Sequence, residues 1–178
     1  MGRDLALAVT SILITDGHEL AGLGAARSLG RAGHRVTVAV PLGLAAPVAR
    51  SRYVAQVISS PNPWACQLAY RQFLGEQSQK HQALLPISEA AIVAAAACRQ
   101  ELASTRLLIP SDEVLHFTLS KYHATRAAQA AGLLTPPTVF VSDGSWPEDL
   151  APLLTSLHEL RYPLLLKHDN YLADGGRY

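Results

Sequence analysis

Five short apolar runs alternate with helix-like stretches over residues 1–110, and this alternation restricts the fold more than any other feature. The runs are SILIT (11–15), RVTVAV (35–40), YVAQVI (53–58), ALLPI (83–87) and RLLI (106–109). Strands that are apolar throughout are typical of a parallel sheet covered on both faces, because both sides of each strand are buried. Joined by helices, such strands predict a right-handed, doubly wound α/β sheet that is Rossmann-like.

The stretches between these runs have the composition of helices. The first is predicted to end at Gly33 and to turn one apolar face toward the sheet, formed by Ala21, Ala25, Leu29 and Ala32. Two more helices are expected at 64–79 and from Glu89 to about Leu102. Residues 1–110 therefore form one predicted domain.

A different pattern begins after residue 110 and predicts a second unit at 111–178, an incomplete α+β lobe. Pro110-Ser111-Asp112 opens a short helix, and Ser120 is placed to cap another that Gly132 closes. Its predicted inner stripe is Ala124, Ala127, Ala128 and Ala131. Strands are expected at 138–141 and 162–167, with a helix to about Leu160 between them.

Composition excludes several classes of protein. The chain has 178 residues, of which 49% are hydrophobic and 16% charged, as in a globular protein. With 15 basic against 14 acidic residues and no basic run, neither a nucleic acid nor a membrane surface is an expected partner. The apolar run at 5–15 is too short to span a bilayer. Cys66 and Cys98 have no metal or redox spacing, which favours reduced thiols in a cytoplasmic protein.

Two familiar motifs are present only in part. Gly22-x-Gly24-x-x-Arg27 resembles a dinucleotide fingerprint, but its glycines fall within the helix and its third glycine is an arginine. His18-Glu19 begins like a zinc-protease motif, but Gly22 stands where the second histidine belongs. Both a dinucleotide site and a zinc site are therefore disfavoured, and no metal ligand is predicted.

Polar residues follow the first and fourth predicted strands. Thr15, Asp16 and Gly17 come after the first, and Ser88 and Glu89 after the fourth. Ligands of open α/β sheets bind at the carboxyl ends of the strands, so these five residues are predicted to face one crevice and bind substrate. The alternative is that Asp16 and Ser88 only cap the helices that follow them.

Two lysines in the second unit are candidates for binding an anion. Lys121 lies in the first turn of its helix, where backbone N–H groups and the helix dipole attract negative charge. Lys167 follows three leucines, and Gly175-Gly176 beyond it could wrap phosphate oxygens. The alternative for both lysines is an ordinary solvated side chain, and for the glycine pair a hairpin turn.

The order of these parts resembles the amino-terminal portion of ATP-grasp enzymes, the superfamily of carbamoyl-phosphate synthetase, biotin carboxylase and D-alanine–D-alanine ligase. ILITDGHELAGLGAARSLGRAGHRVTVA, SRYVAQVISSP and LLPISE are similar to the pre-ATP-grasp domain of carboxylate–amine ligases. LSKYHATRAAQAAGLLTPPTVFV and YPLLLK are similar to the start of the ATP-grasp domain, with DNYLADGGRY in place of its mobile glycine loop.

The resemblance implies a cofactor and a reaction. Lys121 and Lys167 would contact ATP, and Gly175 and Gly176 would belong to the loop over its phosphates. In such enzymes ATP converts a carboxylate to an acyl phosphate, which an amine then attacks, with magnesium neutralising the phosphoryl charge. The resemblance names no catalytic residue in this chain, nor the carboxylate and amine that are joined.

The adenine-binding and magnesium-binding elements of that family lie beyond the segments that match here. We therefore expect this chain to be one part of a ligase and not competent by itself. The alternative is a non-catalytic nucleotide- or small-molecule-binding module, or a split-gene subunit that needs a partner chain. In either case the unfinished lobe is expected to expose apolar surface and to favour a homo-oligomer.

Overall fold

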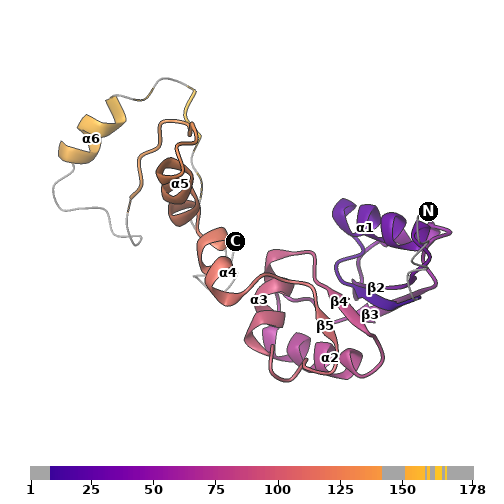
Figure 1. Ribbon diagram of the computed structural model, residues 1–178. Helices are drawn as coiled ribbons and strands as arrows, with labels where there is room; N and C mark the ends of the chain where they lie inside the picture. Colours follow the sequence, from indigo (N-terminus) through magenta and orange to yellow (C-terminus); the bar gives the residue numbers. More distant parts are fainter. Residues whose placement is uncertain (1–8, 142–150, 159, 161–162, 166, 168–178) are drawn as a thin grey trace, which may run out of the picture. The chain divides into compact units, whose positions relative to one another are not determined.

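Five parallel strands form one sheet in the order β3-β2-β1-β4-β5 (Figure 1). This order confirms the predicted Rossmann-like α/β fold. The strands coincide with the five apolar runs, shifted by a few residues at their ends: β1 Ser11–Ile14, β2 Arg35–Pro41, β3 Gln56–Ser60, β4 Ala83–Leu85 and β5 Arg106–Leu107.

The computed structural model describes residues 9–141, 151–158, 160, 163–165 and 167. The chain divides into two units, Met1–Pro110 and Ser111–Tyr178, and each is described by itself. Within the described residues, no helix is both long and apolar enough to cross a membrane.

The central strand β1 is buried on both faces, which explains its continuous apolar sequence. It pairs with β2 on one side and with β4 on the other, so that Leu13 lies between Thr37 and Leu84. Leu13 and Ile14 point to opposite faces of the sheet, and neither side chain is exposed.

Each face of the sheet has its own cover. Helix α1 (Leu20–Arg31) and the 3₁₀ turn η1 (Pro47–Arg50) lie on the face of Ile12, Ile14 and Val38. Helices α2 (Gln67–Ser78) and α3 (Glu89–Ala97) lie on the opposite face, against Leu13, Ala39 and Leu84. The connection from β2 to β3 thus has only the short turn η1, on the α1 side.

The predicted inner face of α1 was correct in part. Ala25 and Leu29 pack against the core, whereas Ala21 and Ala32 are exposed, and the fully buried positions are Gly22 and Ala26. A Cβ atom at position 22 would lie only 2.9 Å from the backbone oxygen of Asp16. The helix is therefore rotated so that a glycine meets the turn after β1, a contact that the apolar periodicity does not encode.

Three helices make up the described part of the second unit: α4 (Asp112–Leu119), α5 (Lys121–Ala130) and α6 (Ala151–His158). Their ends follow the sequence signals. Ser120 accepts a hydrogen bond from the His123 N–H at 3.1 Å as the N-cap of α5, and Gly132 has the left-handed φ of 78° that closes it.

Other predictions for this unit were wrong. No residue of α5 is buried, and Ala124, Ala127 and Ala131 of the predicted inner stripe are exposed. Residues 138–141 do not form a strand, and neither do the described residues of 162–167. A strand needs a neighbour for its backbone hydrogen bonds, and the described part of this unit offers none.

The two neighbouring glycines of α1 allow a matched test of the helix–turn contact. Gly22→Ala should destabilise the fold by about 1–3 kcal/mol, because the added methyl group meets the Asp16 carbonyl. Gly24→Ala meets nothing within 4 Å and should stabilise it by about 1 kcal/mol through helix propensity. Urea unfolding of both variants measures the difference, and equal effects would contradict this account of α1.

Candidate functional site

The turn after β1 is joined to the turn after β4 by side-chain hydrogen bonds. The Asp16 carboxylate (Oδ2) accepts a hydrogen bond from the Ser88 N–H at 3.0 Å and another from the Thr15 hydroxyl. The Thr15 hydroxyl oxygen accepts from the Ile87 N–H, also at 3.0 Å. Thr15 and Asp16 are almost completely buried. The two turns predicted to share one edge of the sheet are therefore physically linked.

Asp16 adopts a conformation that few residues tolerate. Its φ is 54°, in the left-handed region that aspartate and asparagine enter more readily than other non-glycine residues. Its backbone oxygen accepts a hydrogen bond from the Glu19 N–H at 2.8 Å, just before α1. This geometry turns the carboxylate away from α1 and toward Ser88.

Gly17 is required for packing at this turn. A Cβ atom there would lie 2.3 Å from Cγ1 of Val38 and 2.9 Å from Cγ1 of Val48. The Gly17 N–H also donates to the Ala39 carbonyl at 2.9 Å. Gly17 is buried between β2 and η1, and the contacts it makes are with protein. Its predicted contact with substrate stays a prediction.

Ser88 caps the helix that follows it and Asp16 does not, while contact of either residue with substrate stays a prediction. The Ser88 hydroxyl accepts a hydrogen bond from the Ala91 N–H at 3.2 Å, as the N-cap of α3. The N-cap of α1 is Glu19, and no side chain caps that helix. Asp16 instead joins two turns that are 72 residues apart in the sequence.

Two polar atoms near Asp16 are buried and make no hydrogen bond with the described residues. They are Oε1 of Glu89 and the hydroxyl of Tyr70. Tyr70 is on α2, and its ring is 1% exposed, with the hydroxyl close to Thr15 and Asp16 but without a bond of normal geometry. We name Thr15, Asp16, Tyr70, Ser88 and Glu89 the carboxyl-edge cluster.

The chemistry of the carboxyl-edge cluster suits a ligand that carries both a donor and an acceptor of hydrogen bonds. Burial raises the pKa of Tyr70, and the nearby Asp16 carboxylate raises it further, so the phenol stays neutral. A buried carboxylate oxygen without a donor, like that of Glu89, is costly, and an ammonium or amide group would satisfy it.

Sequence reasoning did not find Tyr70. It lies on α2, more than fifty residues after Asp16, and no local motif distinguishes it from other apolar positions of that helix. Only the crossover from β3 to β4 places α2 beside the first turn. The same helix contributes Gln67, whose side-chain N–H group donates to the Ala90 carbonyl at 3.3 Å.

The residues predicted to bind nucleotide belong to the second unit. Lys121 is half-buried in the first turn of α5, whereas Lys167 is exposed. Gly175 and Gly176 lie outside the described residues. The assignment of all four to a nucleotide therefore stays a prediction.

Among the described residues, no group of three or more His, Cys, Asp or Glu side chains could hold a metal ion. The Asp16 carboxylate accepts hydrogen bonds from protein donors, the Thr15 hydroxyl and the Ser88 N–H.

Comparison with known proteins bears on the fold. No family model matches the chain, and no curated protein matches it in sequence. Among solved structures it is similar to L-amino acid ligase from Bacillus licheniformis, with a TM-score of 0.55 and 16% identity. That match covers 78% of this chain and 36% of the ligase, so the chain spans about a third of the ligase's length.

A weaker similarity is to AtPrR2 in its apo form, with a TM-score of 0.45 and 15% identity over 70% of this chain and 45% of the other. The chain is thus related in fold to part of an L-amino acid ligase. At this level of identity the likeness shows the fold and not the activity.

Replacement of Asp16 tests the link between the two turns. Asp16→Ala should lower the free energy of unfolding by about 2–4 kcal/mol, because Ser88 loses its acceptor and alanine disfavours a positive φ. Asp16→Asn keeps an acceptor and tolerates the left-handed region, so its loss should be about 1 kcal/mol. Urea unfolding distinguishes these values. Equal stability of the two variants would contradict this role of the side chain.

Proposed function

We propose that this chain is the amino-terminal part of an ATP-dependent, magnesium-dependent ligase that joins a carboxylate to an amine through an acyl phosphate. The observation that best supports a binding role is the buried, unpartnered Oε1 of Glu89 beside the Asp16–Ser88 link. The fold likeness to part of an L-amino acid ligase and the order of the sequence segments support the reaction class.

In this proposal the carboxyl-edge cluster binds the amine substrate. Glu89 would accept a hydrogen bond from its ammonium or amino group, and the neutral Tyr70 hydroxyl would donate to a substrate oxygen. Asp16 acts as a positioning residue, because its carboxylate holds the Ser88 N–H and so fixes the start of α3, where Glu89 lies. Thr15 holds the same loop through the Ile87 N–H.

The nucleotide would be bound by the second unit. Lys121 and Lys167 are proposed to contact ATP phosphates, with Gly175 and Gly176 closing over them. When bound, ATP with magnesium supplies the phosphoryl group that activates the carboxylate. The magnesium ligands are proposed to lie outside the described residues, as the resemblance to ATP-grasp enzymes implies.

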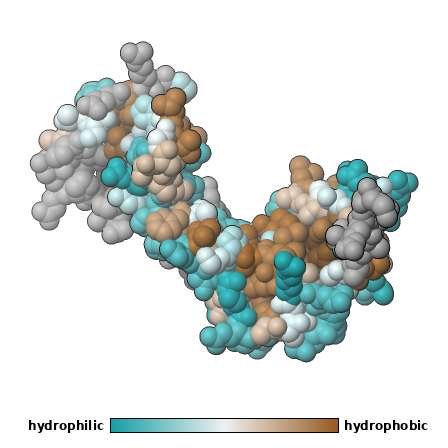
Figure 2. Space-filling view, in the orientation of Figure 1, coloured by the Kyte–Doolittle hydropathy of each residue, from teal (hydrophilic) through white to brown (hydrophobic). Residues whose placement is uncertain are grey.

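A second candidate is a non-catalytic subunit that binds a partner chain. It is favoured by the apolar surface of the second unit, where Leu133 is 63% exposed and Leu134 fully exposed. Figure 2 shows hydrophobic side chains (brown) among hydrophilic ones (teal) on the surface of this unit. Exposed apolar side chains that adjoin one another, such as those of Leu133 and Leu134, favour contact with another protein segment.

The ligase proposal predicts ADP formation by the native polypeptide only when magnesium and an amino acid mixture are both present. Lys167→Ala should lower kcat about 100-fold, because removal of one group that stabilises the transferring phosphoryl typically costs this much. Glu89→Gln should raise KM for the amino acid and leave KM for ATP unchanged. A coupled ADP assay measures all three constants.

An exposed cation of the first unit provides the control. Arg50→Ala, in η1, should behave as the wild type. ADP formation that does not depend on amino acids, or a Lys167→Ala variant with unchanged kcat, would overturn the ligase proposal.

The partner-subunit candidate predicts self-association of the purified 178-residue chain. Its mass in light scattering should rise with protein concentration, and the double variant Leu133→Ser, Leu134→Ser should reduce that rise. Leu20→Ser is the matched control, because Leu20 is 83% exposed but lies in the first unit. A wild-type chain that stays monomeric at every concentration would count against this candidate.

A further inference from the structure

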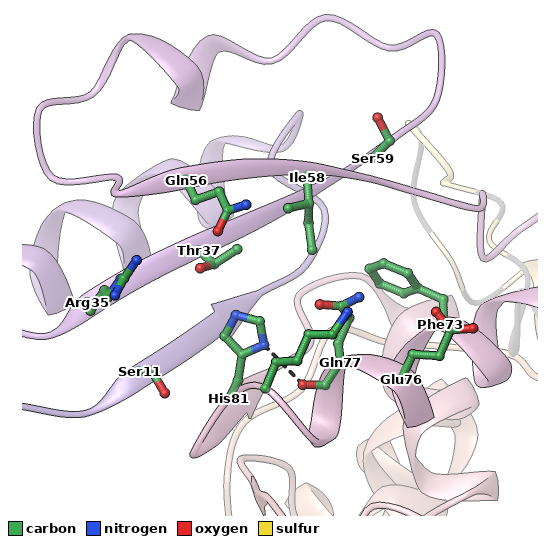
Figure 3. A pocket seen from close by; sticks show the side chains of 11 residues that line it. Ser11, Arg35, Thr37, Gln56, Ile58, Ser59, Phe73, Glu76, Gln77 and His81 are labelled. Carbon is green, nitrogen blue, oxygen red and sulfur yellow. Dashed lines mark hydrogen bonds between the residues drawn. The ribbon is translucent and has the colours of Figure 1, made fainter.

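A polar cavity lies in the first unit, on the α2 side of the sheet (Figure 3). It has a volume of about 480 Å³ and is lined by the first halves of β2 and β3 and by one side of α2. Binding cavities for small molecules typically measure about 300–1,000 Å³. The carboxyl-edge cluster lies beyond the opposite ends of the strands, so this cavity is a separate feature.

The topology explains why the cavity is hollow. The connection between β2 and β3 passes through η1 on the α1 side, so no helix of that connection covers these two strands on the α2 side. Helix α2 continues toward β4 and packs beside α3 over β1 and β4. The β2–β3 part of this face is left to side chains that project from the strands.

Strand register gathers polar side chains on this uncovered part. Thr37 and Gln56 are neighbours across β2 and β3, and Arg35 is two residues before Thr37 on the same face. From α2, Phe73, Glu76 and Gln77 line the cavity with the spacing of one helical stripe, and Lys80 lines it just after the end of that helix. Figure 3 shows Thr37 and Gln56 on the strands, with Gln77 and His81 across the cavity from them.

Two of these polar side chains, those of Thr37 and Gln77, are largely buried and have no hydrogen-bonding partner in the described part of the protein. Thr37 is 4% exposed and Gln77 9% exposed, yet neither side chain makes a hydrogen bond with any described residue. Thr37 stands between Val36 and Val38 in a strand that is otherwise apolar. Because both residues line the cavity, the Thr37 hydroxyl and the Gln77 amide are available to pair with a ligand in it.

Hydrogen-bond donors outnumber acceptors in the lining of the cavity, which favours an anionic ligand. Arg35 and Lys80 contribute cations, and Thr37, Gln56 and Gln77 can each donate a hydrogen bond. Glu76 is the one carboxylate in the lining. We propose that this cavity binds a small organic carboxylate, with the acid group held by Arg35 and Thr37. This site is independent of the ligase proposal and extends beyond it.

Citrate is a suitable probe, titrated into the full 178-residue chain by calorimetry and by amide chemical shifts. We expect saturable binding, with shifts centred on the first residues of β2 and β3 and on the cavity side of α2. Thr37→Val and Arg35→Gln should each weaken binding about tenfold, the usual effect of losing a hydrogen bond to a charged group. Glu76→Gln should strengthen it about threefold, because a like charge is removed.

Two controls separate binding from folding. Valine has nearly the shape of threonine and favours strands, so Thr37→Val should keep or raise the melting temperature while it weakens binding. Arg35 is exposed, so its replacement leaves the fold intact, and Arg27→Gln removes an equally exposed cation on α1 without affecting binding. Absence of saturable binding, shifts centred on the carboxyl-edge cluster, or wild-type affinity in both cavity variants would overturn the proposal.

Discussion

Pairing of β1 with strands on both sides is the constraint on which the rest of the first unit depends. β1 pairs in parallel with β2 on one side and with β4 on the other. Its buried side chains contribute to the core on each face of the sheet. The chain leaves β1 at Asp16, and only a residue that accepts a positive φ can turn there toward α1 and still reach Ser88. The geometry of the carboxyl edge follows from that turn.

The two ends of the sheet differ in hydrogen-bonding character. At the carboxyl edge, the buried polar atoms of the cluster without partners are one acceptor, Oε1 of Glu89, and one hydroxyl, that of Tyr70. Toward the amino ends of β2 and β3, the polar groups are mainly donors, with Arg35 and Thr37 on one face. The same parallel topology produces both, because it gathers the starts of strands at one end and their ends at the other.

In the second unit, the predicted helix ends were confirmed, whereas the predicted strand and the predicted buried stripe of α5 were wrong. Ser120 and Gly132 were correctly predicted as helix ends, since capping depends on residues within one turn of each other. The strand predicted at 138–141 did not form, because β-structure requires a partner strand and Pro136 and Pro137 offer no N–H. The alanine stripe of α5 likewise has no neighbour that buries it among the described residues.

The sequence by itself determined the five strands and their parallel arrangement, because a strand buried on both faces must be apolar throughout. It also identified the two polar turns that meet at one edge, from their positions after the first and fourth strands. Only the tertiary structure decided what brings these turns together: Asp16 holds the Ser88 N–H, and Tyr70 arrives from α2. The reason is physical, since each of these contacts joins residues from separate elements or turns, and no local pattern records which side chains the crossovers bring together.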